Sequence, residues 1–337
     1  MVWVKICGIT NIKDADSVSD MGADAIGFIF SSLSKRKISF EEAEKIIHFL
    51  RKKYNLMPHL VPSEAQYLSM QHDKNYNLIN EDYENYKKLG SHKSYYEYNE
   101  YNNYYYNNNN YKGGMPSIVG VFVNEEIDVV IKNTVLLNLD FVQFSGDEDV
   151  SYLSRFNQKI KKEFKYFKEI NNFSKNYKKD LDLNNDLNKT NQNLKYNNLN
   201  YKKLINKKDN LVKLIKLIRI DTSKVNSSYT DNSYIKEKLI KEISNFKNSV
   251  DYFLLDTYKD NMYGGTGETF NWRVIQDFGK YFPVILAGGL SPENVKEAIN
   301  IVKPFGVDAS SKLEVEPGKK DIKKVNEFIK NAKSDSI

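Results

Sequence analysis

Hydrophobic residues in this chain gather in short runs, and stretches with helical spacing separate most of these runs. At the start of the chain, Val2, Val4 and Ile6 occupy every second position, which is the period of a β-strand. Gly8 interrupts this alternation, and Asn11 is a suitable cap for a helix that follows it. The pattern therefore predicts a first strand that leads directly into a first helix.

Seven further apolar runs predict strands. They cover residues 25–30, 117–123, 139–144, 211–218, 250–256, 284–287 and 305–309. Helical spacing covers residues 11–21, 39–53, 127–135, 152–156, 234–246 and 321–332. Ser39 with Glu42 forms a capping box, Asn124 and Ser291 are the predicted caps of later helices, and Pro292 suits a first helical position. Eight strand–helix units predict the α/β class, as a single (β/α)8 TIM barrel over residues 1–337.

Two stretches break this pattern. Residues 54–114 are rich in Tyr and Asn, and they lack the aliphatic residues that would offset the entropy of ordering, so we expect a disordered insertion. Residues 171–210 form a second insertion that is rich in Asn and Lys. Both insertions follow a helix and precede a strand, which places them on the face of the barrel opposite the active site. Without them roughly 230 residues remain, a normal size for this fold.

The composition limits the classes of function. A single Cys excludes an intrachain disulfide and fits a reducing compartment, so we expect a cytoplasmic protein. No apolar run has transmembrane length, and no room for a signal peptide precedes the first strand, so no membrane partner is expected. The net charge of +6 is modest, and much of the lysine lies in the insertions. It is compatible with an anionic substrate, and no nucleic-acid partner is expected.

Cys7 lies at the carboxyl end of the first predicted strand, which is where (β/α)8 barrels carry their chemistry. A thiol there can act as a base or a nucleophile if a nearby cation lowers its pKa, and Lys5 points to the same face of the strand. The alternative is a small buried hydrophobic residue. None of the four histidines ends a predicted strand, which leaves the thiol as the candidate base; they are His48, His59, His72 and His92.

The loops after strands seven and eight predict a phosphate site, because barrels often bind phosphate there. Gly288 and Gly289 allow backbone N–H groups to approach phosphate oxygens, and Ser310 and Ser311 add hydroxyl donors. The alternative for each loop alone is a tight turn into a helix.

Asp256 ends the sixth predicted strand, and the glycine-rich segment 263–267 follows it closely. A strand-end carboxylate beside a glycine-rich loop favours an acid–base residue next to a mobile active-site loop. Taken alone, Asp256 is better explained as a capping or solvated carboxylate, and it becomes a candidate acid as the partner of Cys7. The alternative for the loop is a flexible surface turn, which its place directly after the carboxylate disfavours.

The order of these motifs resembles that of the phosphoribosylanthranilate isomerase family of tryptophan biosynthesis. The motifs are KICGIT (5–10), SKR (34–36), VGVFVN (119–124), LLDT (254–257), YGGTG (263–267), LAGGL (286–290) and VDASS (307–311). The resemblance implies the conversion of N-(5′-phosphoribosyl)anthranilate to 1-(2-carboxyphenylamino)-1-deoxyribulose 5-phosphate. This is an Amadori rearrangement, the third step of tryptophan synthesis from chorismate, and it needs no metal or organic cofactor.

The resemblance also implies a role for each site residue. Asp256 is the general acid that opens the ribose ring, and Cys7 is the base that removes the C2′ proton. Arg36 pairs with the anthranilate carboxylate through its planar guanidinium, and Asp308 faces the sugar hydroxyls. Gly265 and Ser145 belong to the substrate pocket. The phosphate is held by Gly288, Gly289, Ser310 and Ser311. The partner is then a phosphorylated small molecule, and the expected state is a monomer or a homodimer.

Two positions depart from the family pattern. Ser145 stands where the family usually has a histidine of the substrate pocket, and Lys312 stands where most members have a glycine. Neither change touches the acid or the base, so we expect activity with a raised Michaelis constant.

Two other functions remain open from the sequence. A related isomerase acting on an aminoaldose of the histidine pathway uses two aspartates, against which Cys7 argues. A catalytically impaired barrel, acting as a scaffold or a nucleic-acid-associated protein through its insertions, is the alternative from a different class.

Overall fold

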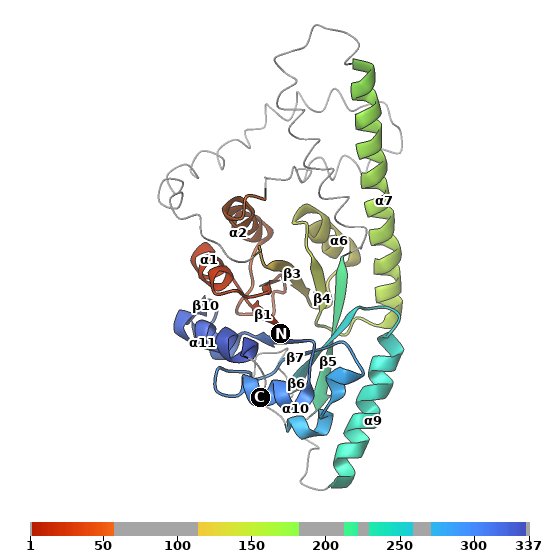
Figure 1. Ribbon diagram of the computed structural model, residues 1–337. Helices are drawn as coiled ribbons and strands as arrows, with labels where there is room; N and C mark the ends of the chain where they lie inside the picture. The colour runs from red at the N-terminus through yellow and green to blue at the C-terminus, as the bar shows by residue number, and fades with distance from the viewer. Residues whose placement is uncertain (1, 57–113, 182–211, 222–228, 259–270, 335–337) are drawn as a thin grey trace. The chain divides into compact units, whose positions relative to one another are not determined.

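The computed structural model describes residues 2–56, 114–181, 212–221, 229–258 and 271–334. Eight parallel strands close into a barrel in chain order, and β1 pairs with β8 (Figure 1). The strands are β1 (Trp3–Cys7), β2 (Ala25–Ile29), β3 (Ser117–Phe122), β4 (Phe141–Phe144), β5 (Lys213–Asp221), β6 (Tyr252–Tyr258), β7 (Val284–Leu286) and β8 (Gly306–Ala309). Each of the eight predicted strands is present, and the predicted (β/α)8 barrel is confirmed.

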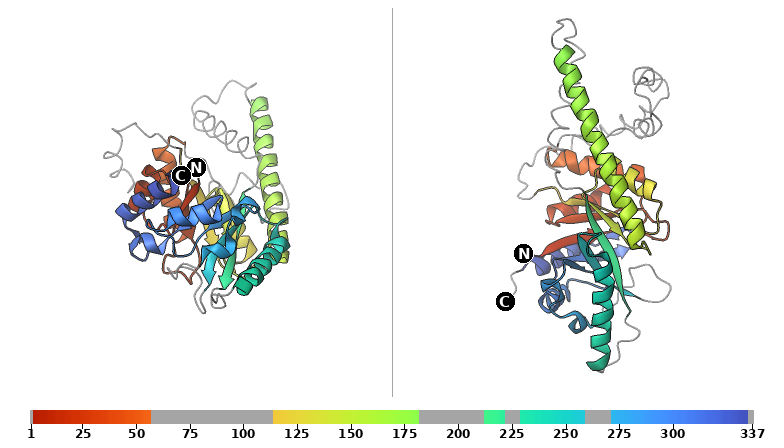
Figure 2. Two further views of the ribbon diagram at one scale, coloured as in Figure 1. Left: turned by 60° about the horizontal axis from the view of Figure 1, so that its bottom comes forward. Right: turned by 90° about the vertical axis from the view of Figure 1, so that its right-hand side faces the viewer.

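Helices cover the outside of the strands (Figure 2). They are α1 (Ile12–Asp20), α2 (Phe40–Lys53), α6 (Ile127–Leu136), α7 (Val150–Leu181), α9 (Tyr229–Phe246), α10 (Val295–Val302) and α11 (Ile322–Lys333). Between β6 and β7 the described residues form two short 3-10 helices, η3 (Trp272–Ile275) and η4 (Phe278–Lys280). None of the described helices is both long enough and apolar enough to cross a bilayer.

The local signals at helix starts were only partly correct. Asn11 and Ser39 cap α1 and α2 as predicted, and Ser39 forms the capping box with Glu42. Asn124 is not a cap: its φ is 49°, and its N–H donates to Glu148 Oε1 at 2.8 Å. Ser291 is not a cap either, because α10 begins at Val295 after a turn that contains Pro292.

A short hairpin that the apolar pattern did not predict follows β8. Beyond β8 the chain makes a 3-10 turn, η5 (Ser311–Leu313), and a small antiparallel pair of strands, β9 (Glu314–Glu316) and β10 (Lys319–Lys320). This hairpin returns the chain to the carboxyl end of β1, since Lys320 Nζ donates to the carbonyl oxygen of Cys7 at 2.7 Å.

The core inside the barrel consists of residues at alternate positions of the strands. Its members are Cys7, Ala25, Val119, Val121, Ile215, Leu217, Leu254, Ile285 and Ala287. Trp3, Phe141 and Tyr252 pack against this cluster at the amino-terminal end of their strands. The amino-terminal end of the interior is therefore filled with apolar side chains, and the buried Lys5 lies above them, below Cys7.

The two predicted insertions lie in helix-to-strand connections. Residues 57–113 separate α2 from β3, and residues 182–211 separate α7 from β5. Such connections join a barrel at the amino ends of its strands, opposite the end that carries catalytic groups. Residues 57–113 and 182–211 lie outside the described residues. Helix α7 continues to Leu181 and so includes the first part of the predicted insertion 171–210. The chain divides into two units, residues 62–114 and the remainder, and the barrel belongs entirely to the remainder.

Candidate active site

Cys7 is the last residue of β1, and its side chain is 5% exposed. Its register partner on β2 is Gly27. A Cβ atom at Gly27 would lie 2.7 Å from Cys7 Sγ and 3.1 Å from Lys5 Cε, both of which are too close. The glycine thus makes space inside the barrel for the thiol and for the lysine below it.

Lys5 lies two residues before Cys7 on the same face of β1, and it is fully buried. Its Nζ atom is 3.0 Å from Oδ1 of Asp308, which is also its register partner on β8. The contact is an ion pair that lacks the angular geometry of a hydrogen bond. Both atoms are buried, and neither has a hydrogen-bond partner in the described part of the chain. A charged lysine therefore sits directly beneath the thiol.

Burial and charge act in opposite directions on these two groups. Burial lowers the pKa of Lys5, but Asp308 and Cys7 together raise it above the ordinary lysine value, so Lys5 carries its charge. Burial raises the pKa of the Cys7 thiol, and Lys5 and Lys320 only partly oppose this effect. The structure therefore differs from the expectation of a thiol whose pKa is lowered, because burial outweighs the two cations.

Asp256 lies in β6, four residues after Tyr252 and two after Leu254, whose side chains pack in the barrel interior. Since strand side chains alternate, Asp256 shares this inward face and lies nearer the carboxyl end. In the closed ring, β7 and β8 separate β6 from β1 on one side. Cys7 and Asp256 therefore face the same end of the interior, with the loops after β7 and β8 between them.

Those two loops have the backbone features of an anion site. Gly288 and Gly289 follow β7 with φ values of 86° and 66°, and Asn294 holds the loop by donating to the Gly289 carbonyl at 3.0 Å. The backbone N–H groups of the two glycines donate no hydrogen bond to any described residue, and the same holds for Ser310 and Ser311 after β8. The Ser310 hydroxyl, however, donates to the Cys7 carbonyl at 3.0 Å, so the backbone supplies more free donors than the side chains do.

Arg36 follows β2, and its stem lies against Gly8, the residue after Cys7. A Cβ atom at Gly8 would lie 2.7 Å from Arg36 Cδ and 3.0 Å from Ser310 Oγ, and the φ of Gly8 is +77°. Both constraints require a glycine at this position. Arg36 is thereby placed beside Gly8, the residue after Cys7, and beside Ser310 of the loop after β8, and it forms an ion pair with Glu314 of β9.

Ser145 follows β4 and is buried, and Gln143 donates to its hydroxyl at 2.9 Å. Arg219 of β5 donates to the Ser145 carbonyl at 2.8 Å. Below this turn, Lys216 forms a buried ion pair of 3.0 Å with Glu148 and donates to the Gly146 carbonyl at 2.8 Å. The loop after β4 is thus fixed from below by β5, and Ser145 is held at the rim of the interior.

Gly265, which was predicted for the substrate pocket, lies outside the described residues. Of the four histidines, none of which was predicted for the site, His48 lies on α2, and His59, His72 and His92 lie outside the described residues. Within the described ranges the chain has no cluster of three metal-ligating side chains. Sequence reasoning missed Gly27, Glu314 and Lys320; a glycine inside an apolar strand run was the available signal for Gly27.

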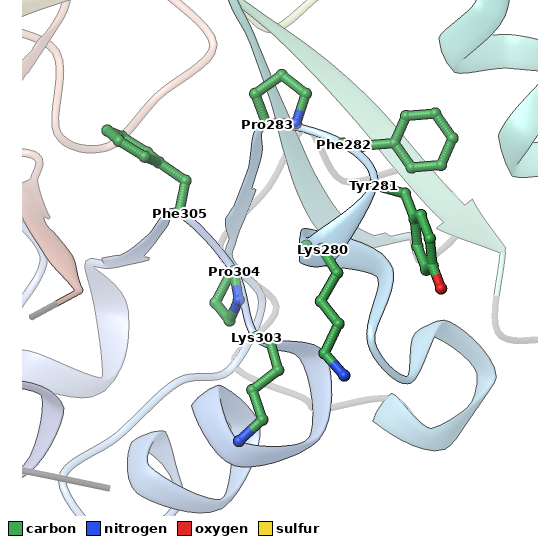
Figure 3. Close-up of a pocket in the computed structure, with 8 residues that line it drawn as sticks. Lys280, Tyr281, Phe282, Pro283, Lys303, Pro304 and Phe305 are labelled. Atoms are coloured by element: carbon green, nitrogen blue, oxygen red, sulfur yellow. The ribbon is translucent and has the colours of Figure 1, made fainter.

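An open groove of about 450 Å³ lies elsewhere, lined by the segments that precede β7 and β8 (Figure 3). Its lining includes Lys280, Tyr281, Lys303 and Phe305. Because these segments enter the strands from their amino ends, the groove belongs to the end of the barrel opposite Cys7 and takes no part in the site.

The fold and the site together define a (β/α)8 barrel that carries a buried thiol, a strand carboxylate and two glycine- and serine-containing loops toward the carboxyl end of its strands. The model of the family N-(5′-phosphoribosyl)anthranilate isomerase matches residues 83–188 and 184–331. The chain belongs to this family, and the isomerase activity in tryptophan biosynthesis predicted from its motifs is confirmed.

Individual relatives agree with this assignment. The N-(5′-phosphoribosyl)anthranilate isomerase of Thermotoga neapolitana is 29% identical over 99% of each chain. The crystal structure of phosphoribosyl anthranilate isomerase from Thermotoga maritima is 26% identical, covers 99% of each chain and gives a TM-score of 0.55. A phosphoribosyl anthranilate isomerase in complex with reduced 1-(o-carboxyphenylamino)-1-deoxyribulose 5-phosphate is 25% identical over 99% of each chain, with a TM-score of 0.53. The family assignment favours an enzyme over the scaffold alternative.

Proposed function

We propose that Cys7 and Asp256 are the base and the acid of an Amadori rearrangement of N-(5′-phosphoribosyl)anthranilate. The observation that carries this proposal is the order of the ring: β7 and β8, whose loops offer free N–H donors, lie between β1, which ends in Cys7, and β6, which carries Asp256 two residues before its end at Tyr258. A phosphate bound by those loops directs the attached ribose across the mouth of the barrel, between the two groups.

In the first step the Asp256 carboxyl group donates a proton to the ribose ring oxygen. The bond between this oxygen and C1′ breaks, and the anthranilate nitrogen supplies the electron pair that forms a C1′=N iminium ion. The product of this step is an open-chain Schiff base, and Asp256 is left as a carboxylate. General acid catalysis of this kind contributes roughly 10²- to 10⁴-fold to a rate.

In the second step the thiolate of Cys7 removes the proton from C2′. The electrons of the C–H bond form a C1′=C2′ double bond, and those of the iminium bond return to nitrogen, which gives an enolamine. A proton then adds to C1′ and the C2′ hydroxyl loses its proton, which yields the ketone. Lys5 stabilises the thiolate from directly below, which matters because burial otherwise disfavours the charged form.

Substrate binding uses the remaining residues. We assign the phosphate to the backbone of Gly288, Gly289, Ser310 and Ser311, and the anthranilate carboxylate to Arg36. Asp308 has one oxygen near Lys5 and is assigned to the sugar hydroxyls. Gly265 and Ser145 are assigned to the substrate pocket.

The remaining expectations also stand as proposals. The chemistry described above uses only side chains, so no cofactor enters it. We propose a cytoplasmic location, since a buried free thiol in the active site needs a reducing environment. The oligomeric state stays a prediction of a monomer or a homodimer.

The test is a fluorescence assay of phosphoribosylanthranilate, formed in situ from anthranilate and phosphoribosyl pyrophosphate. We expect the wild-type protein to consume the fluorescent substrate, and Cys7→Ala and Asp256→Asn to lose at least roughly 10²-fold in kcat. Asp251→Asn is the matched control, because Asp251 precedes the same strand at its other end and pairs with Lys213. Folded wild-type protein without turnover would overturn the proposal, and full activity of either site variant would remove that residue from its role.

A further inference from the structure

Glu314 connects two cations beside the catalytic thiol. Arg36 Nε donates to both Glu314 oxygens at 2.9 Å, and Arg36 Nη2 lies 2.8 Å from Oε2. On the other side, Lys320 Nζ donates to Glu314 Oε1 at 2.7 Å and to the Cys7 carbonyl at 2.7 Å. A continuous chain of polar contacts therefore runs from the guanidinium to the backbone of the thiol-bearing residue.

The charges in this cluster are shielded from water. The side chains of Glu314 and Lys320 are 4% and 0% exposed, and that of Arg36 is 16% exposed. Burial raises the pKa of Glu314, but Arg36 and Lys320 outweigh it and hold that pKa below the ordinary value, so the carboxylate is ionised. Burial lowers the pKa of Lys320, an effect that Glu314 opposes, and Arg36 and Lys320 together offset the charge of the Glu314 carboxylate beside the mouth of the barrel.

The geometry determines which N–H donors of Arg36 are available to a substrate. A guanidinium has five N–H donors in a plane, and Glu314 occupies those on the Nε and Nη2 side. Arg36 Nη1 makes no hydrogen bond or ion pair with the residues that the structure describes. The stem of Arg36 is held over Gly8, where a side chain would collide with it. The guanidinium is thus fixed on one edge and open on the edge bearing Nη1.

We propose that Glu314 is a positioning residue that orients Arg36 toward the carboxylate on the aromatic ring of the substrate and so sets selectivity for a carboxylate there. Lys320 fixes Glu314 and balances its charge, which prevents the carboxylate from repelling the substrate. This inference rests on the proposed role of Arg36. It adds Glu314 to the residues proposed for substrate binding. Glu314 lies 278 positions after Arg36 in the chain, so no local sequence motif reveals their contact.

The first experiment compares Glu314→Gln with Glu316→Gln. Glu316 lies in the same hairpin, is exposed and pairs only with the exposed Lys319 among the described residues, so it is a matched control. Steady-state kinetics with phosphoribosylanthranilate should show KM raised roughly 10- to 100-fold in Glu314→Gln, the loss of one charge-assisted contact, with kcat within a few-fold. The control should match wild type. A carboxamide analogue of the substrate should bind Glu314→Gln and wild type equally.

The second experiment uses Arg36→Met, alone and combined with Glu314→Gln. If Glu314 acts through Arg36, the double variant has the KM of Arg36→Met, whereas independent effects that multiply would overturn the inference. Normal KM in Arg36→Met would overturn the proposed role of Arg36 itself. Raised KM in Arg36→Met with normal KM in Glu314→Gln would overturn only the inference.

If Glu314→Gln does not fold, as judged by circular dichroism, Glu314→Asp replaces it. This variant keeps the negative charge between the two cations but withdraws the carboxylate by one methylene group. Raised KM with unchanged kcat supports the positioning role. Wild-type values for both constants would overturn it.

Discussion

Lys5 and Asp308 are register partners on neighbouring strands, and their charged atoms lie 3.0 Å apart directly beneath the thiol of Cys7. The strand pairing that closes the barrel therefore also creates the charge environment of the base. Lys5 favours the thiolate, Asp308 disfavours it, and burial decides the net direction. The pairing of β1 with β8 thus both closes the barrel and sets the charges that act on the pKa of the thiol.

This relationship predicts the pH dependence of the reaction. The base works as a thiolate, and its pKa is raised, so the ascending limb of kcat/KM should lie above the value of about 8.5 of an ordinary thiol. Lys5→Met removes the main cation, raises the pKa further and should lower activity at neutral pH roughly ten-fold or more. The pH–rate profile and the ultraviolet absorbance of the single thiolate measure both effects.

Lys35→Met serves as the control for that experiment, because Lys35 is exposed. Its profile should coincide with that of wild type. If the ascending limb of the kcat/KM profile lies at the same pH in Lys5→Met as in wild type, the lysine does not act on the pKa of the thiol.

The space at Gly27 predicts a second result. Gly27→Ala would place a methyl group 2.7 Å from Cys7 Sγ, and we expect a loss of about 1–3 kcal/mol in the free energy of unfolding, because the packed strands cannot move apart. The value of kcat/KM should fall as well, since the thiol is displaced. Gly114→Ala, which meets no atom within 4 Å, should change neither quantity. Urea unfolding and the fluorescence assay give the two readings, and an unaltered Gly27→Ala would contradict the packing argument.

The buried pair of Lys216 and Glu148 predicts a large effect on stability. Their side chains are 5% and 1% exposed, so Lys216→Met leaves an unpaired buried carboxylate and should cost about 3–5 kcal/mol in urea unfolding. Adding Glu148→Gln should recover part of this loss, because the unpaired charge is removed. Lys159→Met breaks an exposed pair with Asp128 and should stay within about 0.5 kcal/mol of wild type. Equal losses in the buried and exposed variants would refute this account.

The placement of the first insertion predicts tolerance of its removal. Deletion of residues 60–112, replaced by a short linker, should leave kcat/KM unchanged, because the segment lies in the chain between α2 and β3, and β3 begins at the end of the barrel away from the site. Loss of activity in a folded deletion variant would assign this segment a part in catalysis. Loss of a binding partner with retained activity would add a second role to the enzyme.

The strands could be predicted from sequence because a buried parallel strand requires an apolar run, and that requirement is local. That Asn124 does not cap a helix could not be predicted, because its backbone N–H donates to Glu148, a residue of the following strand–helix unit. Cys7 could be placed at the end of its strand from the order of the runs, whereas β6 continues to Tyr258, two residues past the predicted end at Asp256. The direction in which the pKa of the thiol shifts could not be predicted, because it depends on how burial competes with Lys5 and Lys320 in the packed barrel.

The late position of β8 and the β9–β10 hairpin has a consequence for how the protein matures during translation. β1 is the first strand to leave the ribosome, yet one of its two edges pairs only with β8, and Lys320 reaches the Cys7 carbonyl only after β10 is made. A nascent chain therefore carries an uncovered edge of β1 until β8 is made. Chains that terminate before β8 are expected to lack the Lys5–Asp308 pair beneath the thiol and to associate through that edge.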